Sequence, residues 1–234
     1  SIGVQAQTGV VIDDVPQPTF SLLANELADI ERVEVLAGPQ STLSGRNSAG
    51  GLINIVTRSP KDEWGVDASL EQTTDNQFRA TAFVTGPLTP GLSFSLSGYT
   101  NQWDGWAENV RDGKNLLGYD VWGLRGKLRA EISPSITATL SGFYQRSDAN
   151  RMPNGGGVYI TSGAGSLFGQ TFAQRFPGVT ASLDNTDVSV AAIGDQRAKS
   201  RGGDLRVEFD LGAATLTSIT SYSKYDRPIV DYFA

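Results

Sequence analysis

The chain contains neither cysteine nor histidine among its 234 residues. Without a thiol or an imidazole, cysteine catalysis, a Ser-His-Asp triad and metal sites built on Cys or His are excluded. A formal net charge of −6 also argues against nucleic acid as a partner, because nucleic-acid binding needs a basic face. The sequence therefore points away from the commonest catalytic and nucleic-acid-binding classes.

Long hydrophobic runs are also lacking. No stretch of about 18 apolar residues is present, so we expect no transmembrane helix. The chain opens at Ser1 directly into polar sequence, with no signal peptide. We therefore expect the numbering to begin inside a longer precursor.

The first sixty residues alternate short apolar runs with turn residues. Strands are predicted over Val10–Val15, Ile30–Leu36 and Leu52–Thr57, from their apolar periodicity. A short helix is predicted over Ser21–Asp29, which has leucines on one side, and the segment Pro16–Ser21 is expected to form a loop. This segment is typical of a small α+β unit.

Four glycines lie between the second and third predicted strands, in the segment 38–51. A phosphate-binding loop would need GxxxxGK followed by Ser or Thr, but Gly45 is followed by Arg46 and Asn47. We therefore interpret these glycines as turn residues that allow close backbone approach.

From Trp64 onward the sequence alternates polar and apolar residues in segments of roughly ten residues, as in outer-membrane barrels. Seven strands are predicted, over residues 64–74, 76–86, 91–102, 119–131, 135–146, 202–211 and 214–226. Alternation alone would also suit a soluble sandwich. The connections favour a barrel, because short turns alternate with long loops over 103–118 and 147–201.

The fourth of these strands fixes its own orientation. A shift of one residue would turn Arg125, Lys127 and Arg129 together toward lipid, at roughly 2–4 kcal/mol for each charge at the bilayer midplane. We therefore expect the three side chains to face the lumen. Aromatic residues near strand ends predict girdles at the two membrane interfaces; they are Trp64, Tyr99, Trp103, Trp106, Tyr119, Trp122, Tyr144, Tyr222 and Tyr225.

The segment 30–60, IERVEVLAGPQSTLSGRNSAGGLINIVTRSP, resembles the end of the plug domain of TonB-dependent outer-membrane receptors. That family typically reads IERIEVLRGP, then LYG, then GGxINIxT before its barrel, and the upstream segment 11–16 resembles its V-x-V/I-D-G-V-P strand. Ala37 and Ser44 depart from the pattern, where the family usually has Arg and Tyr. The missing Arg leaves Arg32 and Arg46 as candidates for plug-to-barrel contacts, with Glu34.

The resemblance implies a transmembrane β-barrel of about 22 strands, about seven of them here, with an α+β plug domain in the lumen. Residues 1–60 would be the C-terminal part of the plug, and residues 61–234 the first barrel strands of a longer receptor in the bacterial outer membrane. It implies uptake rather than catalysis, no cofactor or bound metal, and as partners TonB with its inner-membrane energising complex, outer-membrane lipid and a small-molecule ligand. A ferric siderophore is the first candidate for that ligand.

Family topology places the outward apex of the plug at the loop after the first strand. Candidate ligand-binding residues are therefore Gln17, Thr19 and Phe20, where Phe20 could equally pack into the plug. In the long outer loops, aromatic and basic side chains could grip an anionic aromatic siderophore; they are Trp103, Trp106, Arg111, Arg146 and Arg151. Solvated loop charges are the alternative explanation.

Three other functions stay open: uptake of an oligosaccharide, cobalamin or an aromatic compound; a surface receptor or adhesion role without uptake; and a soluble β-rich enzyme or binding module. Asp13 and Asp14 are adjacent carboxylates, but calcium needs further spaced oxygen ligands, so a turn at a strand end is the better interpretation.

Overall fold

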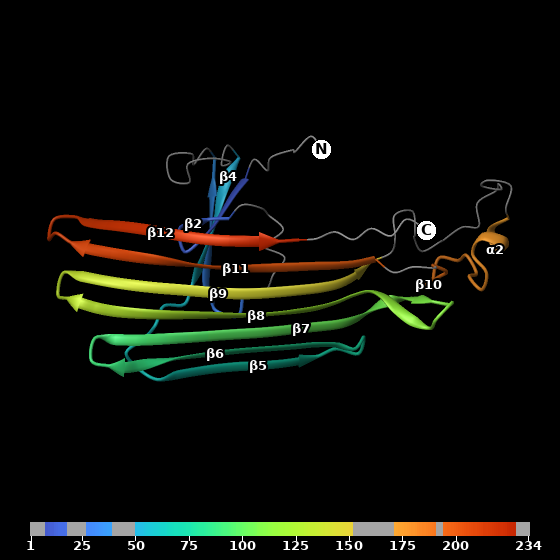
Figure 1. The fold of residues 1–234 in the computed structure, drawn as a ribbon, viewed down its shortest axis with the longest axis horizontal. Helices are drawn as coiled ribbons and strands as arrows, with labels where there is room; N and C mark the ends of the chain where they lie inside the picture. Colours follow the sequence, from blue (N-terminus) through green and yellow to red (C-terminus); the bar gives the residue numbers. More distant parts are fainter. Residues whose placement is uncertain (1–7, 18–26, 39–49, 152–170, 191–193, 228–234) are drawn as a thin grey trace.

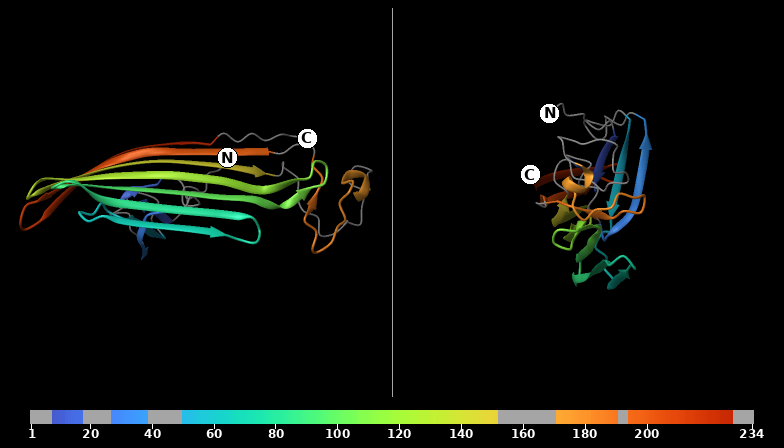
Figure 2. Two further views of the ribbon diagram at one scale, coloured as in Figure 1. Left: turned by 90° about the horizontal axis from the view of Figure 1, so that it is seen from below. Right: turned by 90° about the vertical axis from the view of Figure 1, so that its right-hand side faces the viewer.

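The structure, a computed structural model, describes residues 8–17, 27–38, 50–151, 171–190 and 194–227. Nearly all of these residues lie in strands of two sheets, a small one near the N-terminus and a large one formed by the rest (Figure 1). Seen from two further directions, the small sheet lies beside one face of the curved large sheet (Figure 2). Among the described residues, no helix is long and apolar enough to cross a membrane.

The small sheet has the strand order β2-β1-β4-β3. Strand β1 (Thr8–Ile12) runs parallel to β4 (Gly51–Thr57), and β3 (Ile30–Ala37) pairs antiparallel with the other edge of β4. The two strands predicted at 30–36 and 52–57 are thus confirmed. Val10, Val11, Leu52 and Ile55 are buried and form the apolar centre of this sheet.

The strand predicted over Val10–Val15 is wrong as a single element. The chain turns at Asp13 and Asp14, and β2 (Val15–Pro16) folds back on β1. Both aspartates have positive φ, +49° and +66°, which suits the primed two-residue hairpin turns in which Asp is favoured. The strand-end turn is therefore confirmed. Only residues 27–29 of the predicted helix are described, and Ala28 and Asp29 lie in a turn.

The large sheet is an antiparallel meander with the order β12-β11-β9-β8-β7-β6-β5. Its strands are β5 (Gly65–Gln72), β6 (Gln77–Thr89), β7 (Leu92–Asn109), β8 (Lys114–Ser133), β9 (Ile136–Arg151), β11 (Gly194–Asp210) and β12 (Thr215–Asp226). All seven predicted strands are confirmed. The turns between β6 and β7, β8 and β9, and β11 and β12 lie at one end of the sheet, whereas the turns between β5 and β6 and between β7 and β8 lie at the other end, together with the long connection between β9 and β11 (Figure 1).

The outer loop predicted over 103–118 is wrong. Strands β7 and β8 continue through it and leave only residues 110–113 as a turn. The alternation fails here because of a bulge between Gly105 and Ala107 and a positive φ of +68° at Leu117. Gly118 permits the close approach, since a Cβ there would lie 2.5 Å from two carbonyl oxygens of β7.

The predicted loop over 147–201 also shrinks at both ends, because β9 runs to Arg151 and β11 starts at Gly194. Large apolar side chains are lacking on both faces of the strands in this part, so the sequence shows no alternation of apolar and polar residues there. Two short elements lie in the connection, α2 (Phe172–Arg175) and β10 (Asp187–Val188), which pairs with β7.

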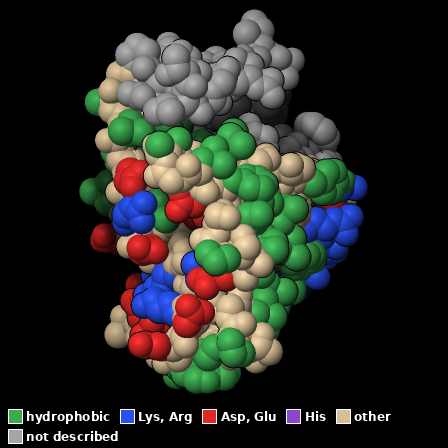
Figure 3. All heavy atoms as spheres, turned by 90° about the vertical axis from the view of Figure 1, so that its left-hand side faces the viewer, with side chains coloured by type: hydrophobic (Ala, Val, Ile, Leu, Met, Phe, Trp, Pro, Cys, Tyr) green, Lys and Arg blue, Asp and Glu red, His purple; other side chains and the backbone are tan. Residues whose placement is uncertain are grey.

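The two faces of the large sheet differ in chemistry. The inner face, toward the small sheet, carries Lys127 and Arg125 and is buried. The outward face exposes a band of leucines, namely Leu96, Leu124, Leu128, Leu140 and Leu205, each exposed by 43–53%. Viewed from the end that carries the β8–β9 turn, hydrophobic side chains run down one side, and many acidic and basic ones gather on the other (Figure 3). The predicted lumen-facing register of β8 is confirmed.

The predicted aromatic girdles are only partly correct. Trp122, Tyr144 and Tyr222 share the outward face with Leu124, by strand register. In contrast, Tyr99, Trp103 and Tyr119 alternate onto the inner face, and so does Tyr225, which lies opposite Ser200. Proximity to a strand end does not decide the face, because the face depends on whether the position is odd or even.

Candidate functional site

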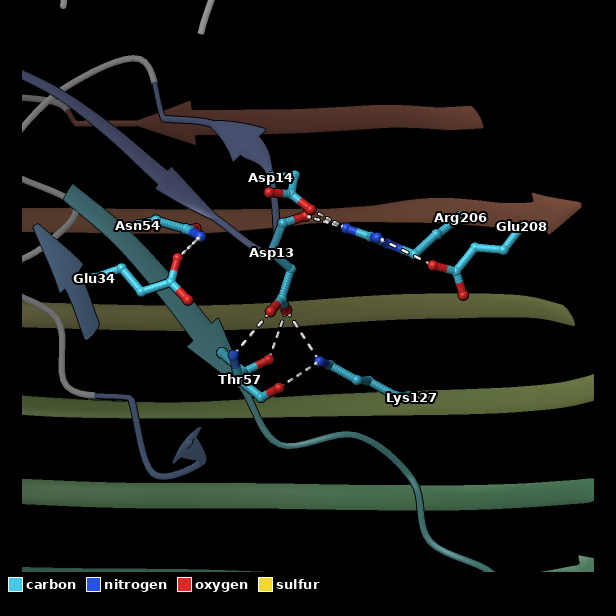
Figure 4. A network of polar contacts seen from close by, with 8 residues as sticks. All are labelled: Asp13, Asp14, Glu34, Asn54, Thr57, Lys127, Arg206 and Glu208. Atoms are coloured by element: carbon cyan, nitrogen blue, oxygen red, sulfur yellow. Dashed lines mark hydrogen bonds and ion pairs between the residues drawn. The ribbon is translucent and has the colours of Figure 1, made fainter. Parts of the chain in front are cut away.

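The turn at Asp13 and Asp14 connects the small sheet to the large one. The Asp13 carboxylate accepts hydrogen bonds from the Thr57 backbone N–H at 2.8 Å and from the Thr57 hydroxyl at 2.6 Å. Lys127 of β8 donates from Nζ to the same carboxylate at 3.0 Å and to the Thr57 carbonyl at 3.4 Å (Figure 4). With Lys127 only 6% exposed, this ion pair is shielded from solvent.

Electrostatics keep Asp13 ionised in this position. Burial raises the pKa of Asp13, but the Lys127 ammonium and the hydrogen bonds from Thr57 outweigh it, so the pKa lies below its ordinary value of 3.8. The turn therefore offers a fixed negative charge to the wall formed by the large sheet.

The neighbouring carboxylate takes a partner on another strand. Asp14 pairs with Arg206 of β11, and the Arg206 guanidinium also donates to the Asp13 carbonyl at 3.4 Å (Figure 4). Glu208 lies 3.5 Å from the other Nη of Arg206 and steadies it. Two adjacent residues thus hold two wall strands that are separated by β9.

A third ion pair lies deeper. Arg125 Nε is 3.6 Å from the Asp29 carboxylate, and both side chains are at most 10% exposed. The Arg125 guanidinium also lies over the Phe143 ring, 5.4 Å from its centroid. We call these three pairs, Asp13–Lys127, Asp14–Arg206 and Asp29–Arg125, the clasp. Each has its acid on the small sheet side and its base on the wall.

The end of β4 is fastened to the wall separately. The Arg58 guanidinium pairs with Asp67 of β5 and covers the Phe83 ring at 4.9 Å, and the Lys61 N–H donates to the Thr85 hydroxyl at 2.9 Å. The segment leaving the small sheet is therefore held where it enters the first wall strand.

Further along the inner face, toward the long connection, a polar and aromatic group lines the wall. Gln77 Nε2 donates to Asn101 Oδ1 at 3.1 Å and to Tyr119 Oη at 3.0 Å. Trp103 meets the Tyr119 ring edge-on at 5.8 Å, and its indole N–H donates to the Asp75 carbonyl at 3.0 Å. We call Gln77, Asn101, Trp103 and Tyr119 the aromatic group. Its rings and amides are held in place by these contacts within the wall.

The predicted ligand-binding residues lie in different places. Trp103 belongs to the aromatic group, and Gln17 lies between the sheets, donating to the Val15 carbonyl at 2.9 Å. Trp106 lies on the β7 bulge, 47% exposed. Arg111 lies in the turn after β7, where Nε donates to the Ser189 hydroxyl at 3.0 Å.

Arg146 and Arg151 are in β9 rather than in a loop. Arg146 lies on the outward face, level with Trp122, and pairs with Asp148 at 2.5 Å. That orientation points it away from the lumen. The side chain of Arg151, and Thr19, Phe20 and Arg46, lie outside the described residues.

The predicted plug-to-barrel contacts Arg32 and Glu34 bind each other at 2.7 Å on β3, and Glu34 also accepts from Asn54 of β4 at 2.9 Å. The Arg32 hydrogen bond, followed by that from Asn54, lowers the pKa of Glu34. These contacts lie within the small sheet. The residues that do reach the wall are Asp13, Asp14 and Asp29, and these contacts were not predicted from the sequence. The row of lumen-facing bases on β8 could have indicated them, because such bases need acidic partners on the small sheet.

One further contact ties down the tip of the β7–β8 hairpin. The Asn109 side chain is 2% exposed; its Oδ1 accepts from the Val190 N–H at 3.1 Å and its Nδ2 donates to the Val190 carbonyl at 3.2 Å. Val188 packs fully buried against Ala107 and Leu116. The segment returning to β11 is thereby fixed on the hairpin.

Comparison with known proteins agrees with this arrangement. Residues 2–52 match the family described as the TonB-dependent Receptor Plug Domain. An iron-regulated outer membrane virulence protein of Vibrio cholerae is 40% identical over 84 residues, which are 33% of this chain and 13% of that protein. The pesticin receptor of Yersinia pestis is 30% identical over 147 residues, 60% of this chain and 21% of that receptor.

Among solved structures, the ferric yersiniabactin uptake receptor FyuA of Yersinia pestis superposes with a TM-score of 0.73 at 21% identity. The superposition covers 95% of this chain and 32% of FyuA. The chain therefore spans about a third or less of the length of the proteins it matches, and the fold of that third is shared.

Proposed function

The chain belongs to the family of TonB-dependent outer-membrane receptors, and we propose from this that it takes part in the active uptake of a ferric siderophore. Its place is the bacterial outer membrane, and its two sheets are part of a plug and part of a barrel wall. The observation that carries the proposal is the clasp, because ion pairs, which can open and close again, hold the plug against the inner face of the wall.

In the proposed cycle the ligand is first captured at the outer end of the lumen. The aromatic group supplies stacking surfaces and hydrogen-bonding groups, as suits a chelate with aromatic or carbonyl oxygens. Gln17, Thr19 and Phe20 would meet the ligand from the plug, and Trp106 and Arg111 from the hairpin tip. Relatives whose names mention iron or siderophores support iron as the cargo.

Release would follow when TonB, energised by the inner-membrane complex, pulls on the plug. The clasp must then open, since Asp13, Asp14 and Asp29 cannot leave the wall while their bases hold them. We further propose that residues 1–60 move as plug and that residues 61–234 stay in the wall. The division falls at the fastened segment of Arg58 and Lys61.

The test is uptake of labelled iron by cells that carry the full-length receptor as their only siderophore receptor. Catecholate, hydroxamate and phenolate iron chelates are supplied singly, with and without TonB. We expect accumulation with one chelate class, abolished by deletion of TonB. Import that persists without TonB would overturn energy-coupled transport. Import of an oligosaccharide, cobalamin or an aromatic compound, with no chelate taken up, would overturn the iron assignment and leave the transport mechanism standing.

A further inference from the structure

On the outward face of the wall, the side chains change from apolar to basic along the strands toward the long connection. The change occurs close to Tyr144 and Tyr222, which are followed two residues later by Arg146 and Lys224. We call the basic side chains at this height the basic patch; they are Arg146, Arg197, Lys199, Arg201 and Lys224. They lie on three neighbouring strands, β9, β11 and β12.

Strand register puts these side chains on the outward face. One row of directly opposed residues crosses four strands, in the order Leu124, Tyr144, Arg201 and Lys224. Leu124 is 51% exposed on the outward face. Directly opposed residues of neighbouring strands point to the same face, so all of them point away from the plug. One step further along, Trp122, Arg146 and Lys199 are aligned in the same way.

The carboxylates nearby satisfy only the rim of the basic patch. Asp148 pairs with Arg146 at 2.5 Å and lies 3.4 Å from Arg197, and Asp226 lies 3.5 Å from Lys224. Asp226 also lies directly opposite Lys199 in the strand register, but its ion pair is with Lys224. Among the residues that the structure describes, Lys199 and Arg201 have no carboxylate within ion-pair distance. Both are exposed.

The basic side chains that oppose one another across neighbouring strands favour binding of an anion. Arg146 lies directly opposite Lys199, and Arg201 directly opposite Lys224. Like charges opposed across a strand pair destabilise a sheet, so the fold itself gains nothing from these two pairs. A bound anion between them would offset the repulsion.

The position of the basic patch along the membrane normal indicates which anion it would meet. The long connection 152–193 emerges at this end of the wall, which marks it as extracellular, since outer-membrane barrels have short periplasmic turns and long outer loops. Tyr144 and Trp122, whose rings lie 5.2 Å apart, stand at the headgroup level that interfacial aromatics occupy. The basic patch therefore lies where the headgroups of the outer leaflet begin.

We propose that the basic patch, centred on Lys199 and Arg201, binds phosphate-bearing lipid headgroups of the outer leaflet. Long basic side chains can lay their stems on apolar surface and extend their charges to the headgroups, and a guanidinium binds phosphate in bidentate fashion.

The test uses the full-length receptor purified in detergent and titrated with diphosphorylated lipid A, with bound lipid counted by native mass spectrometry. The double variant Lys199→Gln/Arg201→Gln should bind about thirty-fold more weakly, since each basic side chain near anionic headgroups contributes roughly fivefold. Dephosphorylated lipid A should bind the unmodified receptor as weakly as the variant binds the phosphorylated form. Free inorganic phosphate should not displace the lipid.

Two controls make the result decisive. Lys199→Arg/Arg201→Lys keeps both charges and should bind as the unmodified receptor does, while Lys114→Gln removes an exposed charge at the hairpin tip, far from the apolar band, and should change nothing. Equal affinity of the Gln double variant, equal binding of dephosphorylated lipid, or displacement by free phosphate would each overturn the proposal. Iron uptake does not enter this assay, so its result is separate from that of the transport test.

Discussion

Lys127 of the wall and Asp13 of the plug form an ion pair of 3.0 Å, while Thr57 holds the same carboxylate from within the plug. The carboxylate is thus positioned by its own domain before it meets the wall. Because Thr57 holds the Asp13 carboxylate in place, the ion pair with Lys127 can break and form again without a conformational change at Asp13.

Removing one charge of this pair should destabilise the receptor more than removing both. Lys127→Met leaves Asp13 buried without a counter-ion and should cost about 3 kcal/mol or more, as when other buried pairs are broken. In Asp13→Asn/Lys127→Met the loss should be smaller. Chemical unfolding of the full-length receptor measures both. Asp67→Asn, at an exposed position, is the control for loss of a charge. Strict additivity of the two single changes would contradict coupling between them.

Acid should loosen the clasp in a defined direction. Because the pKa of Asp13 is lower in the folded protein than its ordinary 3.8, its ionised form stabilises the fold fully above about pH 4, and this contribution falls as the pH drops through the lowered pKa. Hydrogen exchange at the Thr57 amide, which donates to Asp13, reports the change. After correction for intrinsic exchange, protection should fall with acid in the unmodified receptor and should not depend on pH in Asp13→Asn, whose side chain can still accept the hydrogen bond but has no charge to lose. An unchanged profile in that variant would contradict the assignment.

The aromatic group should determine ligand affinity. Trp103→Ala removes a ring from the inner face and should weaken binding of the proposed chelate about tenfold, in line with about 1.4 kcal/mol for one aromatic contact. Binding is measured by radiolabelled chelate retained on cells lacking TonB. Trp122→Ala, on the opposite face of the wall, is the matched control. A larger loss in the control than in Trp103→Ala would count against the site.

The hairpin-tip contact should hold the returning segment in place. Asn109→Ala leaves the Val190 N–H and carbonyl without their side-chain partner, which should cost about 2 kcal/mol. Limited proteolysis of whole cells should then cut within 186–190 faster than in the unmodified receptor. Asn115→Ala, at an exposed position on the same hairpin, should leave the cleavage rate unchanged.

Most of the architecture could be predicted from the sequence because each strand of the wall has one lipid face and one plug face. The alternation around Lys127 gave the right register, and the motif at 30–57 gave the right strands of the plug. Prediction failed where that contrast ends. In β8 before Tyr119 the bulge opposite and the positive φ at Leu117 interrupt the alternation, and in β9 after Arg146 large apolar side chains are lacking. Both segments therefore resemble loops in the sequence although the hydrogen-bond ladder continues.

The candidate site was harder to predict for a different reason. Asp13 and Asp14 look like ordinary turn residues, and their roles depend on Lys127 and Arg206, which are more than a hundred residues away. Arg32 matched an expected contact by its place in a motif, but Glu34 two residues later was a nearer partner. Local sequence shows which side chains are charged; only the fold shows which of them meet.

The parallel pairing of β1 with β4 determines how the plug responds to mechanical force. Strand β4 is fastened at its C-terminal end through Arg58 and Lys61, whereas the chain before β1 leaves from the opposite end of the same pair. A pull on that chain therefore acts along the strands in shear. All the hydrogen bonds from Thr8 to Ile12 share the load, and β1 cannot peel away one residue at a time.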